Sequence, residues 1–323
     1  MKKMVTVKRM VVLFIGIILV GSVILTGSYG LSDTDKKCYE DAASMQKKIE
    51  EIGFQDFKLA DYPIAFCDGK HDYVIMPSGD SYSIHKRKPV LDTFVATAYE
   101  VEGHYEVIVP TKEMMSRFMN IAGAAEQAAT GNPEMNDDES TQVATIWHET
   151  FHCWQLTRFE DNISGLNGEH DFSEEDYGEK LIVKECDENS EVAALYKKGA
   201  GLLKKAAIAD DTEQIRAYLL QYKNIQKQRN ELLGEAAQRL EHYYTSVEGS
   251  ACYVEAMVCR YIDEKKFEED YMEAIDLCAK GASKYYYSGM AQCMILDKLD
   301  STWKAGYDFS EPLINIIYQK LGL

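Results

Sequence analysis

The first 32 residues differ from the rest of the chain in their pattern of hydrophobic and polar positions. Residues 10–32 contain no charged side chain, and residues 10–25 are almost entirely apolar. A membrane-spanning helix needs ~20 residues of this kind. We therefore expect residues 1–32 to form an N-terminal membrane anchor, with a cleaved signal peptide ending near residues 26–30 as the alternative.

Short runs of β type dominate the next part of the chain. After a predicted helix over residues 38–53, runs rich in β-branched and aromatic residues alternate with glycine-containing turns. The last two runs flank Gly103 and predict an edge hairpin. We therefore assign residues 33–137 to a β-rich N-terminal unit. The predicted strands are Pro63–Phe66, Tyr73–Met76, Thr93–Tyr99 and Tyr105–Val109.

Helical periodicity extends from Glu139 to the end of the chain. Asp211 begins a sequence that resembles a capping box, and one long helix is predicted from there toward Arg260, with Ser246 as the candidate break. This order of elements predicts an α+β fold in which a mainly helical unit, residues 138–323, follows the β-rich unit. The other predicted helices cover residues 139–159, 178–208, 266–280, 284–299 and 311–321.

Charge divides the chain at the same place as hydropathy. Residues 1–30 carry four basic side chains and no acidic one, whereas the remainder carries all 53 Asp and Glu residues of the chain. Basic residues before an apolar stretch favour a cytoplasmic N-terminus and an extracytoplasmic body. The acidic body makes nucleic acid an unexpected partner, since phosphate binding requires a basic surface. A hydrophobic content of 46% excludes wholesale disorder.

The cysteines leave two interpretations open. There are eight, and no Cys-x-x-Cys sequence occurs, so zinc ribbons and thioredoxin-type redox sites have no support. An even number outside the cytoplasm permits disulfides. Several of the cysteines nevertheless fall among apolar residues in helical patterns, which is equally typical of buried thiols.

The sequence His148-Glu149-Thr150-Phe151-His152 is the strongest chemical signal in the chain. On a helix, positions 148 and 152 lie one turn apart on one face, so both imidazoles can reach the same metal ion. Neutral imidazole is a good ligand for Zn²⁺. Glu149 lies ~100° around the helix, where its carboxylate can take a proton from a water activated by that metal and pass it to a leaving amine.

A catalytic zinc site usually has a third protein ligand. A metzincin-type site would place Gly at position 155 and His at position 158, and the chain has Gln155 and Arg158 there. The better candidate is Glu248, which is followed by Gly249-Ser-Ala. We expect these small residues to let their helix approach the histidine-bearing helix closely.

These two stretches, His148-Glu149-x-x-His152 and Glu248-Gly-x-Ala-x-Tyr, resemble the gluzincin metallopeptidases of the wider zincin class. The resemblance implies one zinc ion held by His148, His152 and Glu248, with Glu149 as the general base. The interval between His152 and Glu248 is longer than in many members of that class.

The same resemblance extends to the order of elements over residues 90–300. Zincins place a sheet before the zinc helix and further helices after it, and the edge strand of that sheet pairs with extended peptide substrate. Thr93–Tyr99 and Tyr105–Val109 are the two candidates for this edge strand.

Other acidic residues are alternatives or supports for the site. Glu241 and Glu255 share a helical stripe with Glu248, so either is placed to orient a metal ligand from behind, although an exposed acidic face would give the same stripe. An acidic run elsewhere is typical of a solvated face but also offers ligands. The alternative third ligands in this run are Glu185, Glu188 and Glu191.

Peptide hydrolysis also requires a donor to the oxyanion of the transition state. The run Tyr285-Tyr-Tyr287 begins a predicted helix after Glu248, and Tyr287 is the preferred candidate, with Tyr244 and His242 as alternatives.

We expect a membrane-anchored, extracytoplasmic zinc metallopeptidase that acts on peptides or proteins, or a secreted one if the leader is cleaved. The alternative is a catalytically inactive binding protein at the cell surface that keeps the zincin scaffold.

Overall fold

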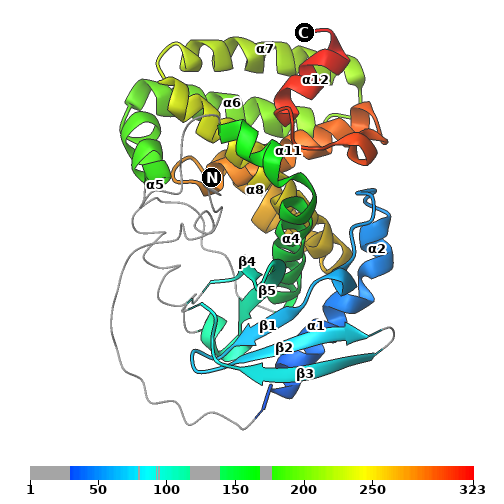
Figure 1. The fold of residues 1–323 in the computed structure, drawn as a ribbon. Coiled ribbons are helices and arrows are strands. Elements are labelled where there is room, and N and C mark those ends of the chain that lie inside the picture. The colour runs from blue at the N-terminus through cyan, green and yellow to red at the C-terminus, as the bar shows by residue number, and fades with distance from the viewer. Residues whose placement is uncertain (1–29, 79–80, 92, 94, 117–138, 168–176) are drawn as a thin grey trace.

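A five-stranded sheet and a helical layer share one hydrophobic core (Figure 1). The computed structural model describes residues 30–78, 81–91, 93, 95–116, 139–167 and 177–323. The sheet lies at one end of the molecule and most of the helices at the other, with α4 (Glu139–Asn167) between them (Figure 1). The prediction of an α+β chain in which a β-rich part precedes a helical part is confirmed.

The sheet has the strand order β3-β2-β1-β5-β4. β1 pairs in parallel with β5, and the other neighbouring strands are antiparallel. The predicted hairpin at Gly103 is confirmed, because Glu102 and Gly103 both have positive φ in the two-residue turn between β4 and β5. The strands are β1 (Ile64–Cys67), β2 (Asp72–Ser78), β3 (Ser81–Arg87), β4 (Thr97–Val101) and β5 (His104–Pro110).

Strand β3 was not predicted from the sequence. Its residues, Ser81–Arg87, are mostly exposed because β3 lies at an edge of the sheet, where no apolar alternation is needed. The opposite edge is β4, whereas β5 lies between β1 and β4. Of the two predicted edge strands, Tyr105–Val109 is therefore an internal strand, and only the segment that contains β4 lies at the edge.

In the part of the chain that the structure describes, the first helix is α1, and Ser32 caps it by accepting from the Asp35 amide. None of the helices in the described ranges has the length and apolarity needed to cross a membrane, and the predicted anchor, residues 1–32, falls almost wholly outside those ranges. The α-helices are α1 (Asp33–Ser44), α2 (Gln46–Glu50), α4, α5 (Tyr177–Leu181), α6 (Ser190–Ile208), α7 (Thr212–Asn230), α8 (Glu235–Ile262), α9 (Glu264–Lys266), α10 (Ala274–Leu277), α11 (Ser283–Leu299) and α12 (Leu313–Leu321).

Several predicted helices are divided differently in the structure. The long helix from Asp211 is two helices, α7 and α8, separated at residues 231–234, and the predicted break at Ser246 is wrong. Ser246 is fully buried inside α8, where its hydroxyl accepts from the Leu313 amide. The predicted helices over 178–208 and 266–280 each contain a π-helical segment, Ile182–Asp187 and Phe267–Met272 respectively.

Aromatic side chains fix α4 in the core. Trp147, Phe151 and Trp154 on α4 are buried against Phe54 and Phe57, which precede the sheet. Offset and edge-to-face contacts of this kind stabilise the packing beyond the area they bury. The opposite face of α4 is thereby turned toward α8.

All eight cysteines lie among the described residues, and each is a buried thiol rather than half of a disulfide. Burial raises the pKa of Cys67 to about 11 and that of Cys252 well above its usual value. Such thiols are poor nucleophiles, so their contribution is to packing.

Candidate metal centre

The two histidines of α4 converge as their spacing predicts. His148 and His152 lie one turn apart, and their Nε2 atoms are 3.0 Å from each other. Their side chains are only 10% and 5% exposed. Both ring nitrogens are thus directed at one buried point between α4 and α8.

Glu248 on α8 completes a group of three donors. Its Oε2 lies 3.2 Å from Nε2 of His152 and 3.6 Å from Nε2 of His148. Tetrahedral ligands about 2.0–2.1 Å from a zinc ion are separated by about 3.3 Å. The observed spacings therefore leave a point about 2 Å from all three atoms, which is where a zinc ion would fit. Among the described residues, these three side chains form the group with metal-ligand geometry.

The outer nitrogens of both imidazoles fix the tautomers. Nδ1 of His148 lies 2.8 Å from Glu255 Oε2, and Nδ1 of His152 lies 2.7 Å from Gln155 Oε1. A carboxylate and an amide oxygen can only accept, so both Nδ1 atoms carry the proton. Each Nε2 then presents a lone pair to the shared point, as a metal ligand must.

Three acceptors that face one another need a positive charge between them. The pKa shifts of these groups show the same need, because each shift favours a charged imidazole beside a charged carboxylate. Burial acts to lower the pKa of His148, but hydrogen bonds to Glu248 and Glu255 raise it well above its usual value. For Glu248, burial acts to raise the pKa, whereas the charge of His152 and hydrogen bonds to both histidines bring it well below its usual range. A divalent cation would supply this charge without protonating the ligands.

Glu149 lies beside this group without joining it. The Ala98 amide of edge strand β4 is close enough to lower the pKa of this carboxylate slightly, and Oε2 is buried with no hydrogen-bond partner. Burial raises the pKa of Glu149 against the opposing effect of His148 and His152. A buried carboxylate oxygen normally has a partner, so this atom is placed to receive a hydrogen bond from water or substrate. Both this atom and the donor set fit the predicted zinc site.

The small residues after Glu248 contact two different helices, α11 and α4. Gly249 approaches Gly289 of α11, and a Cβ added at Gly249 would lie 2.4 Å from Gly289 Cα. Ser250 is the residue that faces α4, where its Oγ accepts from Gln155 Nε2 at 3.0 Å. The prediction that these residues together allow approach to the histidine helix is therefore corrected: the glycine contact is with α11, and it positions Glu248 from behind.

The alternative third ligands are engaged elsewhere. Glu185 accepts from the Gly234 amide at 3.1 Å, before the start of α8. Glu188 and Glu191 are exposed around the N-terminus of α6. The structure does not bring these three acids to the histidines.

The two acids that flank Glu248 on its helix have different roles. Glu255 contacts His148, as described above, and is the acid placed to orient a ligand. Glu241 instead forms a buried ion pair with Arg229 of α7. The sequence placed both on one stripe, but only Glu255 reaches the histidines.

Burial and the charge of Glu248 raise the pKa of two tyrosines, Tyr243 of α8 and Tyr286 of α11. Tyr287 packs edge-to-face against Tyr271, and Tyr244 stacks between Tyr285 and Tyr286. Tyr286 is partly buried, and burial together with the charge of Glu248 raises its pKa well above the usual value, with a smaller effect of Glu149. It thus lies within electrostatic reach of both acids.

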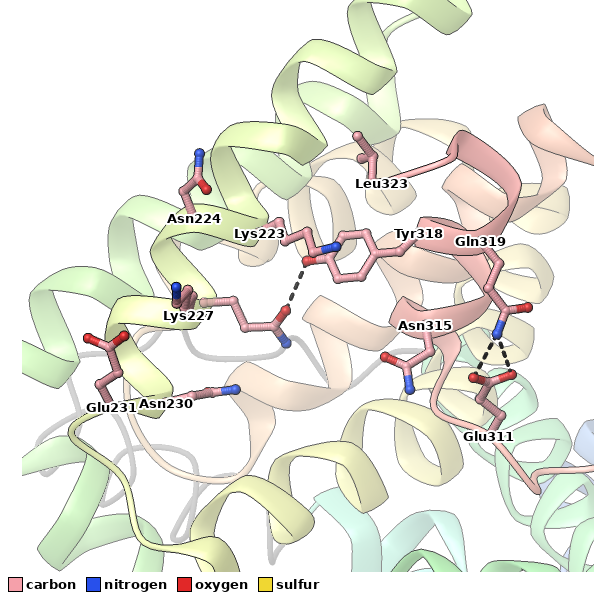
Figure 2. Close-up of a pocket in the computed structure, with 11 residues that line it drawn as sticks. Lys223, Asn224, Lys227, Asn230, Glu231, Glu311, Asn315, Tyr318, Gln319 and Leu323 are labelled. Carbon is pink, nitrogen blue, oxygen red and sulfur yellow. Dashed lines mark hydrogen bonds between the residues drawn. The ribbon is translucent and has the colours of Figure 1, made fainter.

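A separate groove of about 670 Å³ lies between α7 and α12 (Figure 2). Lys223 and Lys227 face Tyr318 and Asn315 across it, and Tyr318 donates to Gln226 at 2.9 Å. Its lining is mainly amide and charged side chains, and it contains none of the residues around His148 and Glu248. The groove is therefore separate from the α4–α8 site.

Comparison with known proteins adds no relative: no protein-family model, no curated protein and no solved structure matches the chain. The interpretation of the α4–α8 site accordingly depends on its own residues and their geometry.

Proposed function

We propose that this protein is a zinc-dependent metallopeptidase of the gluzincin type. The observation that carries the proposal is the convergence of His148 Nε2, His152 Nε2 and Glu248 Oε2, at mutual distances of 3.0, 3.2 and 3.6 Å, beside the unpartnered Oε2 of Glu149. Two imidazoles and one carboxylate are a known zinc donor set that leaves an open position. These residues would hold a zinc ion, which would lower the pKa of a bound water and polarise a carbonyl group.

The residues around the site have distinct roles in hydrolysis. Glu149 accepts a proton from the attacking water and then donates it to the leaving amine, a role that its raised pKa favours. His148 and His152 are held with their lone pairs inward by Glu255 and Gln155. Tyr286 is the candidate donor to the oxyanion.

Extended peptide substrate would pair with edge strand β4. The Ala98 amide of this strand lies near enough to Glu149 to lower its pKa, so a peptide added along β4 would run past the general base. The internal position of β5 leaves it no free edge in the described sheet.

The proposed location is the cell membrane, with the N-terminus in the cytoplasm and the body outside. The charge-free stretch at residues 10–32 and the four basic residues before it support this topology, and a secreted form would result if the leader is cleaved.

Zinc content and the Glu149→Gln variant test the proposal together. We expect the full-length protein, purified in detergent, to contain about one zinc per chain and to cleave a denatured protein substrate. Glu149→Gln should keep the zinc and lose the cleavage, because Glu149 is not a ligand. A folded protein without zinc would contradict the proposal, and a zinc-bound wild type without cleavage would favour the inactive binding protein.

A further inference from the structure

We infer that Gln155 is a positioning residue that locks the ligand His152 of α4 to the segment of α8 around Glu248. This inference depends on the proposed zinc site and adds a residue to it. Gln155 is fully buried, one turn after His152 on the same face of α4. In the sequence it stood out only as a departure from the metzincin pattern.

The amide of Gln155 connects three groups at once. Its Oε1 accepts from His152 Nδ1 at 2.7 Å, and its Nε2 donates to Val247 O and to Ser250 Oγ, both at 3.0 Å. Val247 and Ser250 flank Glu248 on α8. The side chain therefore ties a ligand on one helix to the backbone that carries a ligand on the other.

The orientation of this amide is determined by its partners. Val247 O is a carbonyl and can only accept, so the atom that faces it must be the NH₂ group. Ser250 already donates its hydroxyl proton to Ser246 O at 2.6 Å, so its oxygen is free to accept from Gln155. The oxygen of the amide is consequently directed at His152, and the ring cannot turn without breaking this arrangement.

The Nδ1 atoms of the two histidines thus donate to acceptors of different charge. His148 donates to the carboxylate of Glu255, whereas His152 donates to a neutral amide. A charged acceptor increases the electron donation of its imidazole to a metal more than a neutral one does. The neutral partner at His152 contributes orientation without adding a further negative charge to a site that already contains Glu149, Glu248 and Glu255.

The test is the zinc affinity of full-length variants, measured by competition with a chromogenic chelator. Loss of a group that orients a ligand typically lowers metal affinity by about 10–100-fold. We expect Gln155→Leu to fall in that range. Ser250→Ala removes only one of the two anchors and should lower the affinity by a smaller factor in the same direction.

Thr150→Val is the matched control. Thr150 is fully buried on the opposite face of α4, and its hydroxyl donates to Ile146 O at 2.6 Å. This variant also loses a buried hydrogen bond of α4, so its melting temperature should fall while its zinc affinity stays within twofold of the wild type. A merely structural role of Gln155 would make the two variants behave alike.

Cobalt substitution provides a second measurement that stability does not influence. The visible absorption bands of bound Co²⁺ report ligand geometry, and we expect them to shift in Gln155→Leu and to stay unchanged in Thr150→Val. Wild-type zinc affinity and spectrum in both Gln155→Leu and Ser250→Ala would overturn the inference while leaving the proposed zinc site intact. A wild-type protein that binds no zinc would instead contradict the proposed function itself.

Discussion

The two faces of α8 pack in opposite ways. Toward α4, the contact is made by polar side chains: Glu248 and Glu255 reach the histidines, and Ser250 receives the amide of Gln155. Toward α11, the two backbones meet at Gly249 and Gly289, and aromatic side chains such as Tyr244 pack beside them. One face carries the proposed zinc ligand Glu248, and the other face fixes the position of that ligand. Changes on the first face should therefore affect activity and metal binding, and changes behind it should affect stability.

Of the variants considered, Glu149→Gln should separate activity from stability most clearly. General-base catalysis contributes about 10²–10⁴-fold, so peptide hydrolysis should fall by that factor. Stability should not fall, since the substitution removes a buried charge whose Oε2 has no partner. Peptidase rates and thermal melts of the zinc-bound proteins measure both quantities. A melting temperature that falls in parallel with activity would contradict this separation.

A comparison of Glu241 with Glu255 extends the separation to two acids of one helix. Glu241→Gln leaves the buried Arg229 without its charged partner and should cost about 3–5 kcal/mol of unfolding free energy, with zinc affinity unchanged. Glu255→Gln should instead lower zinc affinity, by about 10–100-fold. Denaturant unfolding and chelator competition on both variants provide the comparison. Equal losses of zinc affinity in the two variants would contradict the different roles assigned to Glu241 and Glu255.

Gly289→Ala tests the glycine face alone. An added Cβ would lie 2.0 Å from Thr245 O, and overpacking of this kind costs about 1–3 kcal/mol or more. Gly201 of α6 has no atom within 4 Å of the corresponding Cβ position, so Gly201→Ala should be neutral or stabilise by up to about 1 kcal/mol. Urea unfolding of both variants is the measurement, and similar stabilities would contradict the close approach of α8 and α11.

Zinc removal should lower the stability of the protein reversibly. A ligand that binds only the folded state at 100 times its dissociation constant stabilises by about 2.7 kcal/mol. A chelator should therefore lower the melting temperature, and added zinc should restore it. The His148→Ala variant should show neither response. A wild-type melting temperature that is independent of zinc would argue against metal binding by the folded state.

Local patterns predicted much of this molecule. His148 and His152 were found because helical spacing alone brings them together, and most of the strands were found from their alternation or apolar runs. Strand β3 was missed because an exposed edge strand needs no apolar face. The helix boundary at residues 231–234 was missed because the apolar periodicity continues across it.

Tertiary relations were harder to predict than local ones. Glu248 was selected from its small neighbours, yet Gly249 packs on α11 and not on α4. A sequence does not give the relative rotation of two helices, so it could not show that the charge of Glu248 acts on Tyr243 and Tyr286. The sequence did not identify Gln155 as part of the site, because its role depends on one carbonyl oxygen and one hydroxyl oxygen of another helix.

X-ray absorption at the zinc edge tests the central claim most directly. We predict a four-coordinate site with two imidazoles and light-atom oxygen ligands at about 2.0–2.1 Å, and loss of one imidazole contribution in His152→Ala. Absence of bound zinc, or a sulfur shell at about 2.3 Å from the cysteines, would contradict the assignment of His148, His152 and Glu248 as the ligands.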